Sequence, residues 1–180
     1  NIPMDDSKVL SLFRNSDTLD LDPVITKINT GTLGIPEFGT GFVRQMLIET
    51  QPTKFSDLIR ISGLSHGTNV WTNNAQELIK EGRANISNVI STREDVMDKL
   101  INSGLDKKQA FHIMERVRKG KGLAENEVKE INALEIDDWF IDSANKISYL
   151  FPKAHAVAYV MMSYRIAYFK LYYPLSFYAA

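Results

Sequence analysis

Helix-start and helix-stop residues follow one another along the whole of this chain, and this succession is what most constrains its fold. A capping acid opens a candidate helix at Asp106, and a glycine ends it at Gly120. The tetrad from Ser91 to Glu94 has capping-box spacing, in which Ser91 accepts from the first turn and Glu94 reaches back. No stretch of useful length alternates apolar and polar residues as a strand does. The sequence therefore predicts an all-α fold of about eight to ten short helices.

The same signals predict further helices near the N-terminus: a capped helix after Asp6 and a helix opened by the cap and proline Asp22-Pro23. Another helix is predicted from Phe55 to a glycine stop at Gly63. The longest helix is predicted at the C-terminus, from about Ala154 to Tyr172, after Pro152. The four glycines between Thr30 and Gly41 predict a shaped loop. Phe42 and Phe111 are expected on the apolar faces of their helices.

Charge is divided unevenly, although the formal net charge is only −1. Residues 107–121 hold six cations against one acid, a local +5, and residues 122–142 hold seven acids against one lysine, a local −6. Such a chain can attract a phosphate backbone with one surface and repel it with another, whereas the plainer interpretation is a set of solvated helix faces. The Gly120-Lys-Gly122 hinge between the two blocks suggests sub-regions 1–120 and 121–180 within one domain of residues 1–180.

The absence of cysteine excludes disulfides and thiolate metal sites, and is compatible with a reducing cytoplasm. Arg165 and Lys170 interrupt the best apolar run, so no stretch reaches the roughly 20 residues that span a bilayer, and we expect no membrane partner. The chain begins at Asn1-Ile-Pro and ends inside an apolar aromatic run. We therefore expect it to be a piece of a larger protein.

The C-terminal part combines aromatic rings with cations. All seven tyrosines fall in residues 149–180, and residues 143–180 contain four Lys or Arg and no carboxylate. Aromatic rings stack on bases at about 1–3 kcal/mol per base, and cations add phosphate attraction. His155 and Tyr159 are four residues apart and share a helix face, with Lys153 just before them. Nucleic acid is the first partner that this pattern indicates; the alternative is a core tyrosine and a capping histidine.

Two other clusters are candidates for binding. Arg118, Lys119 and Lys121 alternate with two glycines that let a backbone approach a phosphate, although cations also complement a helix C-terminus. Ser65 and His66 lie among small polar residues that suit a ligand-facing surface or a plain turn equally well. Metal catalysis is not expected, because the acid pairs sit where helix caps belong and the histidines show no ligand spacing: Asp5-Asp6, Glu94-Asp95, Asp137-Asp138, His66, His112 and His155.

Several motifs, in order along the whole chain, resemble the C-family bacterial replicative DNA polymerases of the PolC type, the DNA polymerase III alpha subunits of Gram-positive bacteria. The matching stretches are Ile2-Pro-Met-Asp-Asp-Ser-Lys-Val, Gly31-Thr-Leu-Gly-Ile-Pro-Glu-Phe-Gly, Phe42-Val-Arg-Gln-Met-Leu, Ile61-Ser-Gly-Leu-Ser-His-Gly-Thr, Asn74-Ala-Gln-Glu-Leu-Ile, Met114-Glu-Arg-Val-Arg-Lys-Gly-Lys-Gly and Phe151-Pro-Lys-Ala-His-Ala-Val-Ala-Tyr. The resemblance implies the all-α fingers domain of a DNA-directed DNA polymerase. That domain positions the template strand and the incoming deoxynucleoside triphosphate during chromosome replication.

The resemblance also implies roles for particular residues. Arg44 and the glycine-rich loop would lie near the template, and Ser65 and His66 by the nucleotide pocket. Candidates for phosphate contacts are Arg93, Arg118, Lys119 and Lys121, and candidates that face the nascent base pair are Lys153, His155 and Tyr159.

The catalytic aspartates of this family belong to its palm, and no segment here resembles that motif. The resemblance thus implies a cytoplasmic nucleotidyltransferase of which this fragment alone is inactive, with Mg²⁺ held by the palm outside this chain. The expected partners are primer–template DNA, deoxynucleoside triphosphates, the palm and thumb domains of the same polymerase, and the sliding clamp in the full enzyme. The alternatives are a non-catalytic helical DNA-binding module and a helical protein-interaction scaffold.

Overall fold

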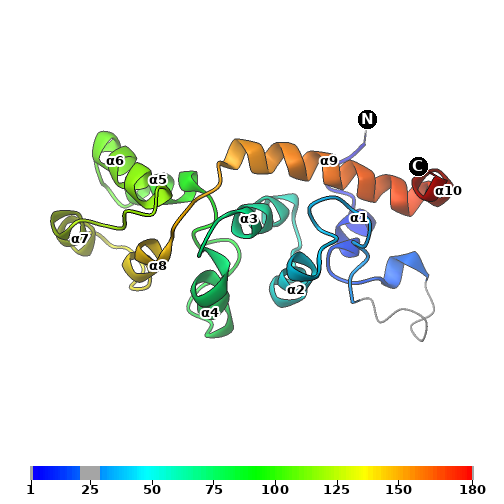
Figure 1. The fold of residues 1–180 in the computed structure, drawn as a ribbon, viewed down its shortest axis with the longest axis horizontal. Coiled ribbons are helices and arrows are strands. Elements are labelled where there is room, and N and C mark those ends of the chain that lie inside the picture. Colours follow the sequence, from blue (N-terminus) through cyan, green and yellow to red (C-terminus); the bar gives the residue numbers. More distant parts are fainter. Residues whose placement is uncertain (1, 21–28, 180) are drawn as a thin grey trace. The chain divides into compact units, whose positions relative to one another are not determined.

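The computed structural model describes residues 2–20 and 29–179, and this part of the chain is built from helices (Figure 1). It contains ten α-helices, two short helical turns of other types and two isolated β-bridges, but no strand. The predicted all-α fold is therefore confirmed. The helix start predicted at Asp22-Pro23 lies outside the described residues.

The helices occur in the following order: α1 (Ser7–Leu12), the 3-10 turn η1 (Asp17–Leu19), α2 (Gly41–Thr50), α3 (Phe55–His66), the π-type turn η2 (Trp71–Ala75), α4 (Gln76–Lys80), α5 (Arg93–Asn102), α6 (Lys107–Arg118), α7 (Glu125–Asn132), α8 (Phe140–Lys146), α9 (Lys153–Tyr172) and α10 (Pro174–Ala179). The predicted long C-terminal helix corresponds to α9 and is confirmed. The sequence pattern missed α10, which follows α9 after a single residue.

The chain forms two compact units. Unit 1 comprises Asn1–Ser62 and Val157–Ala180, and unit 2 comprises Gly63–Ala156. The boundaries fall within α3 and α9, and the expected subdivision at residue 120 coincides with neither of them. Unit 2 therefore contains the whole of the cationic and acidic blocks noted in the sequence, residues 107–142.

The core of unit 1 is aromatic. Phe13 meets Phe38 edge-on, with ring centroids 5.0 Å apart, and lies parallel to Tyr164 at 6.3 Å. Phe55 meets Tyr164 edge-on at 5.6 Å, and the Tyr164 hydroxyl donates to the carbonyl oxygen of Asp6 at 3.2 Å. Asp6 also caps α1, because its carboxylate accepts from the amides of the first turn. Tyr164 therefore joins the aromatic core to the start of α1.

Tyr164→Phe is expected to lower the free energy of unfolding at neutral pH by about 1 kcal/mol, because it removes that hydrogen bond. Burial, followed by the negative charge of Asp6, raises the pKa of Tyr164 from 10.0 to about 12. The unfolded tyrosine therefore ionises first, and the stability that the wild-type hydroxyl contributes is lost as pH rises from 10 through about 12.

Urea unfolding of both proteins at neutral pH and across this alkaline range measures the effect. The stability difference between wild type and variant should shrink as pH rises, and other titrating groups cancel in that difference. A difference independent of pH would contradict the assignment.

Unit 2 packs α5 against α6, which lie side by side (Figure 1). The buried face of α6 is the stripe Ala110, Ile113, Met114 and Val117. Elsewhere in the unit, Asn74 of η2 donates to the carbonyl oxygen of Ser143 at 3.1 Å and accepts from the Ser143 hydroxyl at 2.6 Å. Buried polar groups are satisfied in this way between η2 and α8.

Three local predictions were wrong. The α3 helix does not stop at Gly63 but continues to His66. Gly63 serves close packing rather than helix termination, because a Cβ there would lie 2.6 Å from the carbonyl oxygen of Ser91. Phe42 and Phe111 were expected to be buried, but they are 51% and 47% exposed. Each sits beside the buried stripe of its helix rather than on it, since adjacent helical residues point about 100° apart.

Candidate nucleic-acid interface

A short extended segment, residues 148–151, organises the candidate interface of unit 2. Its backbone pairs with Thr68 just after α3, where the Thr68 amide donates to the Tyr149 carbonyl at 3.0 Å. The Leu150 amide donates to the carbonyl oxygen of Arg118 at 3.3 Å, and the Phe151 carbonyl accepts from the Arg93 amide at 3.3 Å. One segment therefore gathers the end of α3, the start of α5 and the end of α6, and it leads directly into α9.

Phe151 of this segment contacts the rings of two histidines. His66, in the last turn of α3, stacks on Phe151 with ring centroids 4.7 Å apart and planes inclined by 22°. His155, in the first turn of α9, meets the same ring edge-on at 6.0 Å and is exposed. The Ser65 hydroxyl lies 3.2 Å from Nδ1 of His66. His66 and His155, which the sequence placed in separate motifs, thus both contact one phenylalanine, and Ser65 lies beside His66.

Two carboxylates at the start of α5 act as helix caps beside this segment. The Glu94 carboxylate pairs with the Arg93 guanidinium at 3.0 Å and accepts from the backbone amide of Lys153 at 2.8 Å, so that it caps α9. The predicted capping box is displaced by one residue, because Asp95, rather than Glu94, accepts from the amides of Ser91 and Thr92, at 3.0 and 2.8 Å. Thr92 becomes the N-cap, which frees Glu94 for α9.

The end of α6 contributes a cationic turn. Glu115 receives two hydrogen bonds from Arg118, Nε to Oε1 at 2.7 Å and Nη2 to Oε2 at 2.8 Å, and pairs with Lys119 at 3.0 Å. Hydrogen bonds first from Arg118 and then from Lys119 lower the pKa of Glu115 to about 2, so its carboxylate is ionised at neutral pH. Lys121 is exposed and has no carboxylate partner in the part of the chain that the structure describes.

Two predicted site residues belong to unit 1. The Arg44 guanidinium of α2 is half-buried and donates from Nε to the Thr30 hydroxyl at 3.3 Å. Tyr159 of α9 is exposed. The cluster around residues 148–151 thus unites Ser65, His66, Arg93, Arg118, Lys119, Lys153 and His155, but it does not include Arg44 or Tyr159.

The sequence motifs missed three participants in this cluster: Phe151, Glu94 as a cap of α9, and Glu115. A signal was present for Glu115, because it stands three and four residues before Arg118 and Lys119, the spacing of helical ion pairs. The other two depend on contacts between segments distant in sequence. No local pattern could have indicated them.

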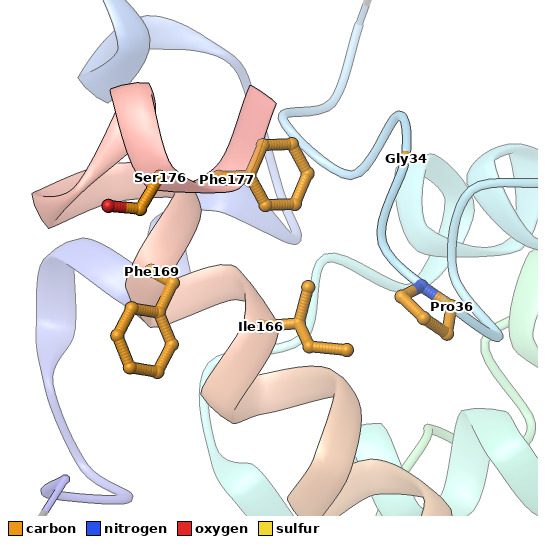
Figure 2. A pocket seen from close by; sticks show the side chains of 6 residues that line it. All are labelled: Gly34, Pro36, Ile166, Phe169, Ser176 and Phe177. Atoms are coloured by element: carbon orange, nitrogen blue, oxygen red, sulfur yellow. The ribbon is translucent and has the colours of Figure 1, made fainter. Parts of the chain in front are cut away.

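Unit 1 has a pocket of a different character, with a volume of about 330 Å³. Figure 2 shows the residues that line it: Ile166 and Phe169 of α9, Ser176 and Phe177 of α10, and Gly34 and Pro36 of the glycine-rich loop. The lining is almost entirely apolar and contains no cation. This pocket is therefore unsuited to a phosphate, and apart from the glycine-rich loop it is lined by none of the residues predicted for the site.

The acid pairs behave as structural groups. Asp6 caps α1, Asp95 caps α5, Asp137 pairs with Lys99, and Asp138 lies 3.3 Å from Arg83. Among the described residues, no three His, Asp or Glu side chains gather as a metal site. In the same part of the chain, no helix is long and apolar enough to cross a membrane.

Comparison with known proteins shows the family of the chain. Residues 1–136 match the family described as the bacterial DNA polymerase III alpha subunit finger domain. A protein named DNA polymerase III PolC-type from Caldanaerobacter subterraneus subsp. tengcongensis is 60% identical over 178 residues, which are 99% of this chain and 13% of that protein. Proteins of the same name from Thermotoga maritima and Staphylococcus aureus are 57% and 55% identical over 179 and 181 residues, again 99% of this chain and 13% and 12% of theirs.

The chain therefore belongs to the family of bacterial DNA polymerase III alpha subunit finger domains, and the resemblance to the PolC type is confirmed. It spans only 12–13% of the length of the curated relatives that it matches.

Proposed function

We propose that this chain is the fingers part of a replicative DNA polymerase and that it helps to position the template strand and the incoming deoxynucleoside triphosphate. The observation that supports this most directly is the gathering of rings and cations on residues 148–151. Rings suit base faces, and cations suit phosphate oxygens. Both kinds of group are held by this one segment, and a nucleotide or a DNA strand offers partners for both.

In this proposal the cations of unit 2 act on phosphates. They neutralise charge on DNA or on the triphosphate, which is the electrostatic part of phosphoryl-type transfer. These cations are Arg93, Arg118, Lys119, Lys121 and Lys153. His66 and His155, held by Phe151, are positioned for contact with a base. Arg44 contacts the template and Tyr159 the nascent pair, each from unit 1. These two roles rest on the family resemblance.

The Mg²⁺ that such a reaction needs has no cluster of ligands among the residues that the structure describes. Among the described residues no three His, Asp or Glu side chains gather as metal ligands, and Asp95 and Asp138 are engaged as a helix cap and in an ion pair. The ion would be held by the palm of the complete polymerase. Palm and thumb domains, and a sliding clamp, are partners of that complete protein.

His155→Ala in the complete polymerase is expected to lower kcat/KM for nucleotide incorporation about tenfold, because stacking on a base is worth about 1–3 kcal/mol. His112→Ala is the matched control, since His112 is also an exposed histidine but lies on α6 away from Phe151. Steady-state incorporation on a primer–template measures both. Equal kinetics for the two variants would contradict the role given to His155.

Primer–template binding by the complete protein across a salt series separates the remaining alternatives. The fingers proposal requires that the correct nucleotide tighten the complex. A non-catalytic DNA-binding module would bind DNA with salt dependence but without an effect of nucleotide, and a protein scaffold would show no salt-dependent binding.

A further inference from the structure

Glu115 is the single carboxylate within the cationic stretch of residues 107–121, and it holds two of the cations proposed to contact phosphate. Its two oxygens accept the Nε and Nη2 protons of Arg118, at 2.7 and 2.8 Å, in a two-pronged arrangement. The Lys119 ammonium lies 3.0 Å from the second oxygen. A phosphate binds a guanidinium through the same kind of paired contact. The carboxylate therefore occupies the edge of Arg118 that a phosphate would use.

This arrangement is anchored to the candidate interface. The carbonyl of Arg118 accepts from Leu150, and Gly120 lies so close to Ser148 that a Cβ on it would be 2.6 Å from the Ser148 carbonyl oxygen. Neighbouring cations differ, since Arg116 pairs with Glu127 of α7 at 3.2 Å, and Lys121 has no carboxylate partner among the described residues. Glu115 thus acts on a defined pair of cations at a fixed place.

The pairing persists at neutral pH because Arg118 and Lys119 keep the pKa of Glu115 low. Both partners of the ion pair are partly exposed, so a phosphate can exchange with the carboxylate without the cost of burying a charge. When a phosphate leaves, the carboxylate takes its place. The cations are then never left without an anion, which lowers the free-energy cost of breaking the phosphate contact.

We propose that Glu115 is a positioning residue that limits how tightly Arg118 and Lys119 hold a DNA phosphate, so that the contact is released as the DNA advances. This inference rests on the proposed function. A protein that moves along DNA must break each phosphate contact repeatedly, and a competing carboxylate makes that step faster.

Glu115→Gln in the complete polymerase tests the proposal, because it keeps the side chain's size and removes its charge. We expect primer–template to bind about three- to tenfold more tightly near 0.1 M salt, with a log–log salt dependence steeper by up to about 0.9, one phosphate contact. The gain should lie in slower dissociation, and extension along a long template should be slower.

Glu125→Gln is the matched control: it removes the same charge from an exposed residue of unit 2 at the start of α7, where no cation is paired with it in the described part of the chain. It should change affinity much less than Glu115→Gln does. A gain in affinity cannot arise from loss of folding, so the expected result is not open to that explanation.

Unchanged or weaker binding by Glu115→Gln would overturn the inference while leaving the proposed function intact. A second comparison tests whether the effect depends on these two cations: Glu115→Gln is added to a protein carrying Arg118→Met and Lys119→Met. In that background Glu115→Gln should not change DNA affinity. A gain in affinity that persists there would show that Glu115 does not act through Arg118 and Lys119. If the wild-type polymerase shows no salt-dependent DNA binding, the proposed function fails, and this inference fails with it.

Discussion

Gly120→Ala is expected to lower the free energy of unfolding of unit 2 by about 3 kcal/mol or more. The backbone of Gly120 is left-handed, with φ +71°, which costs an alanine about 1–2 kcal/mol. The new Cβ would also lie 2.6 Å from the carbonyl oxygen of Ser148, and because that oxygen is backbone, the segment must shift, at about 1–3 kcal/mol. The shift would pull residues 148–151 away from Arg118.

Gly82→Ala isolates the clash from the backbone strain. Gly82 has nearly the same φ, +70°, but nothing lies within 4 Å of the position that a Cβ would take there. Gly82→Ala is therefore expected to lower the free energy of unfolding by only about 1–2 kcal/mol. Urea unfolding followed by tryptophan fluorescence reports on unit 2, because both tryptophans, Trp71 and Trp139, lie in it. If the two variants lost the same free energy of unfolding, the added Cβ at residue 120 would not clash with Ser148.

Lys170→Met is expected to lower the free energy of unfolding of unit 1 by about 2 kcal/mol. Lys170 is only 4% exposed, and its ammonium donates to the carbonyl oxygens of Gly31 at 2.8 Å and Leu33 at 2.6 Å. Methionine fills similar space but leaves both carbonyls without this donor, at about 1–3 kcal/mol for each buried acceptor. Relief from burying a charge offsets part of that loss, since burial, followed by the charge of Arg44, lowers the pKa of Lys170.

Hydrogen exchange at the Gly31 amide provides the local measurement, because this amide donates to the carbonyl of Leu12 at 2.7 Å within the loop that Lys170 holds. Exchange there should accelerate in Lys170→Met. Arg165→Met, an exposed cation on the same helix, is the control and should change stability by no more than about 0.5 kcal/mol. Unchanged exchange in Lys170→Met would show that the loop keeps its shape without the lysine.

The helices themselves were largely predictable. Asp6 and Asp106 cap α1 and α6 as expected, and α9 occupies almost the predicted residues. Local chemistry decides these features, because a capping side chain acts on amides two or three residues away. The errors in helix boundaries and caps occurred where a distant contact overrides a local preference. Gly63 has the composition of a helix stop, but it is held inside α3, where its missing side chain admits the backbone of Ser91.

The candidate site was predictable as a set of residues but not as an arrangement. The cations at the end of α6 and the His155 region stood out by composition, yet the sequence did not indicate that Phe151 would carry His66 and His155 together. The pairing of Arg118 with Glu115 had a signal in their spacing of three residues, but composition alone singled out only the cations. The capping box is displaced by one residue for a similar reason, because the Glu94 carboxylate accepts a hydrogen bond from the amide of Lys153, 59 residues away in sequence.

Residue types and their short-range spacing were enough to predict the all-helical class, most helix boundaries, the family and the kinds of group available for binding. Which of these groups meet depends on the packing of distant segments. Backbone hydrogen bonds from residues 148–151 to Thr68, Arg93 and Arg118 bring the ends of three helices to one place. Such bonds can form between any two segments whose backbone groups need partners, so side-chain identity does not specify them, and only the packed chain does.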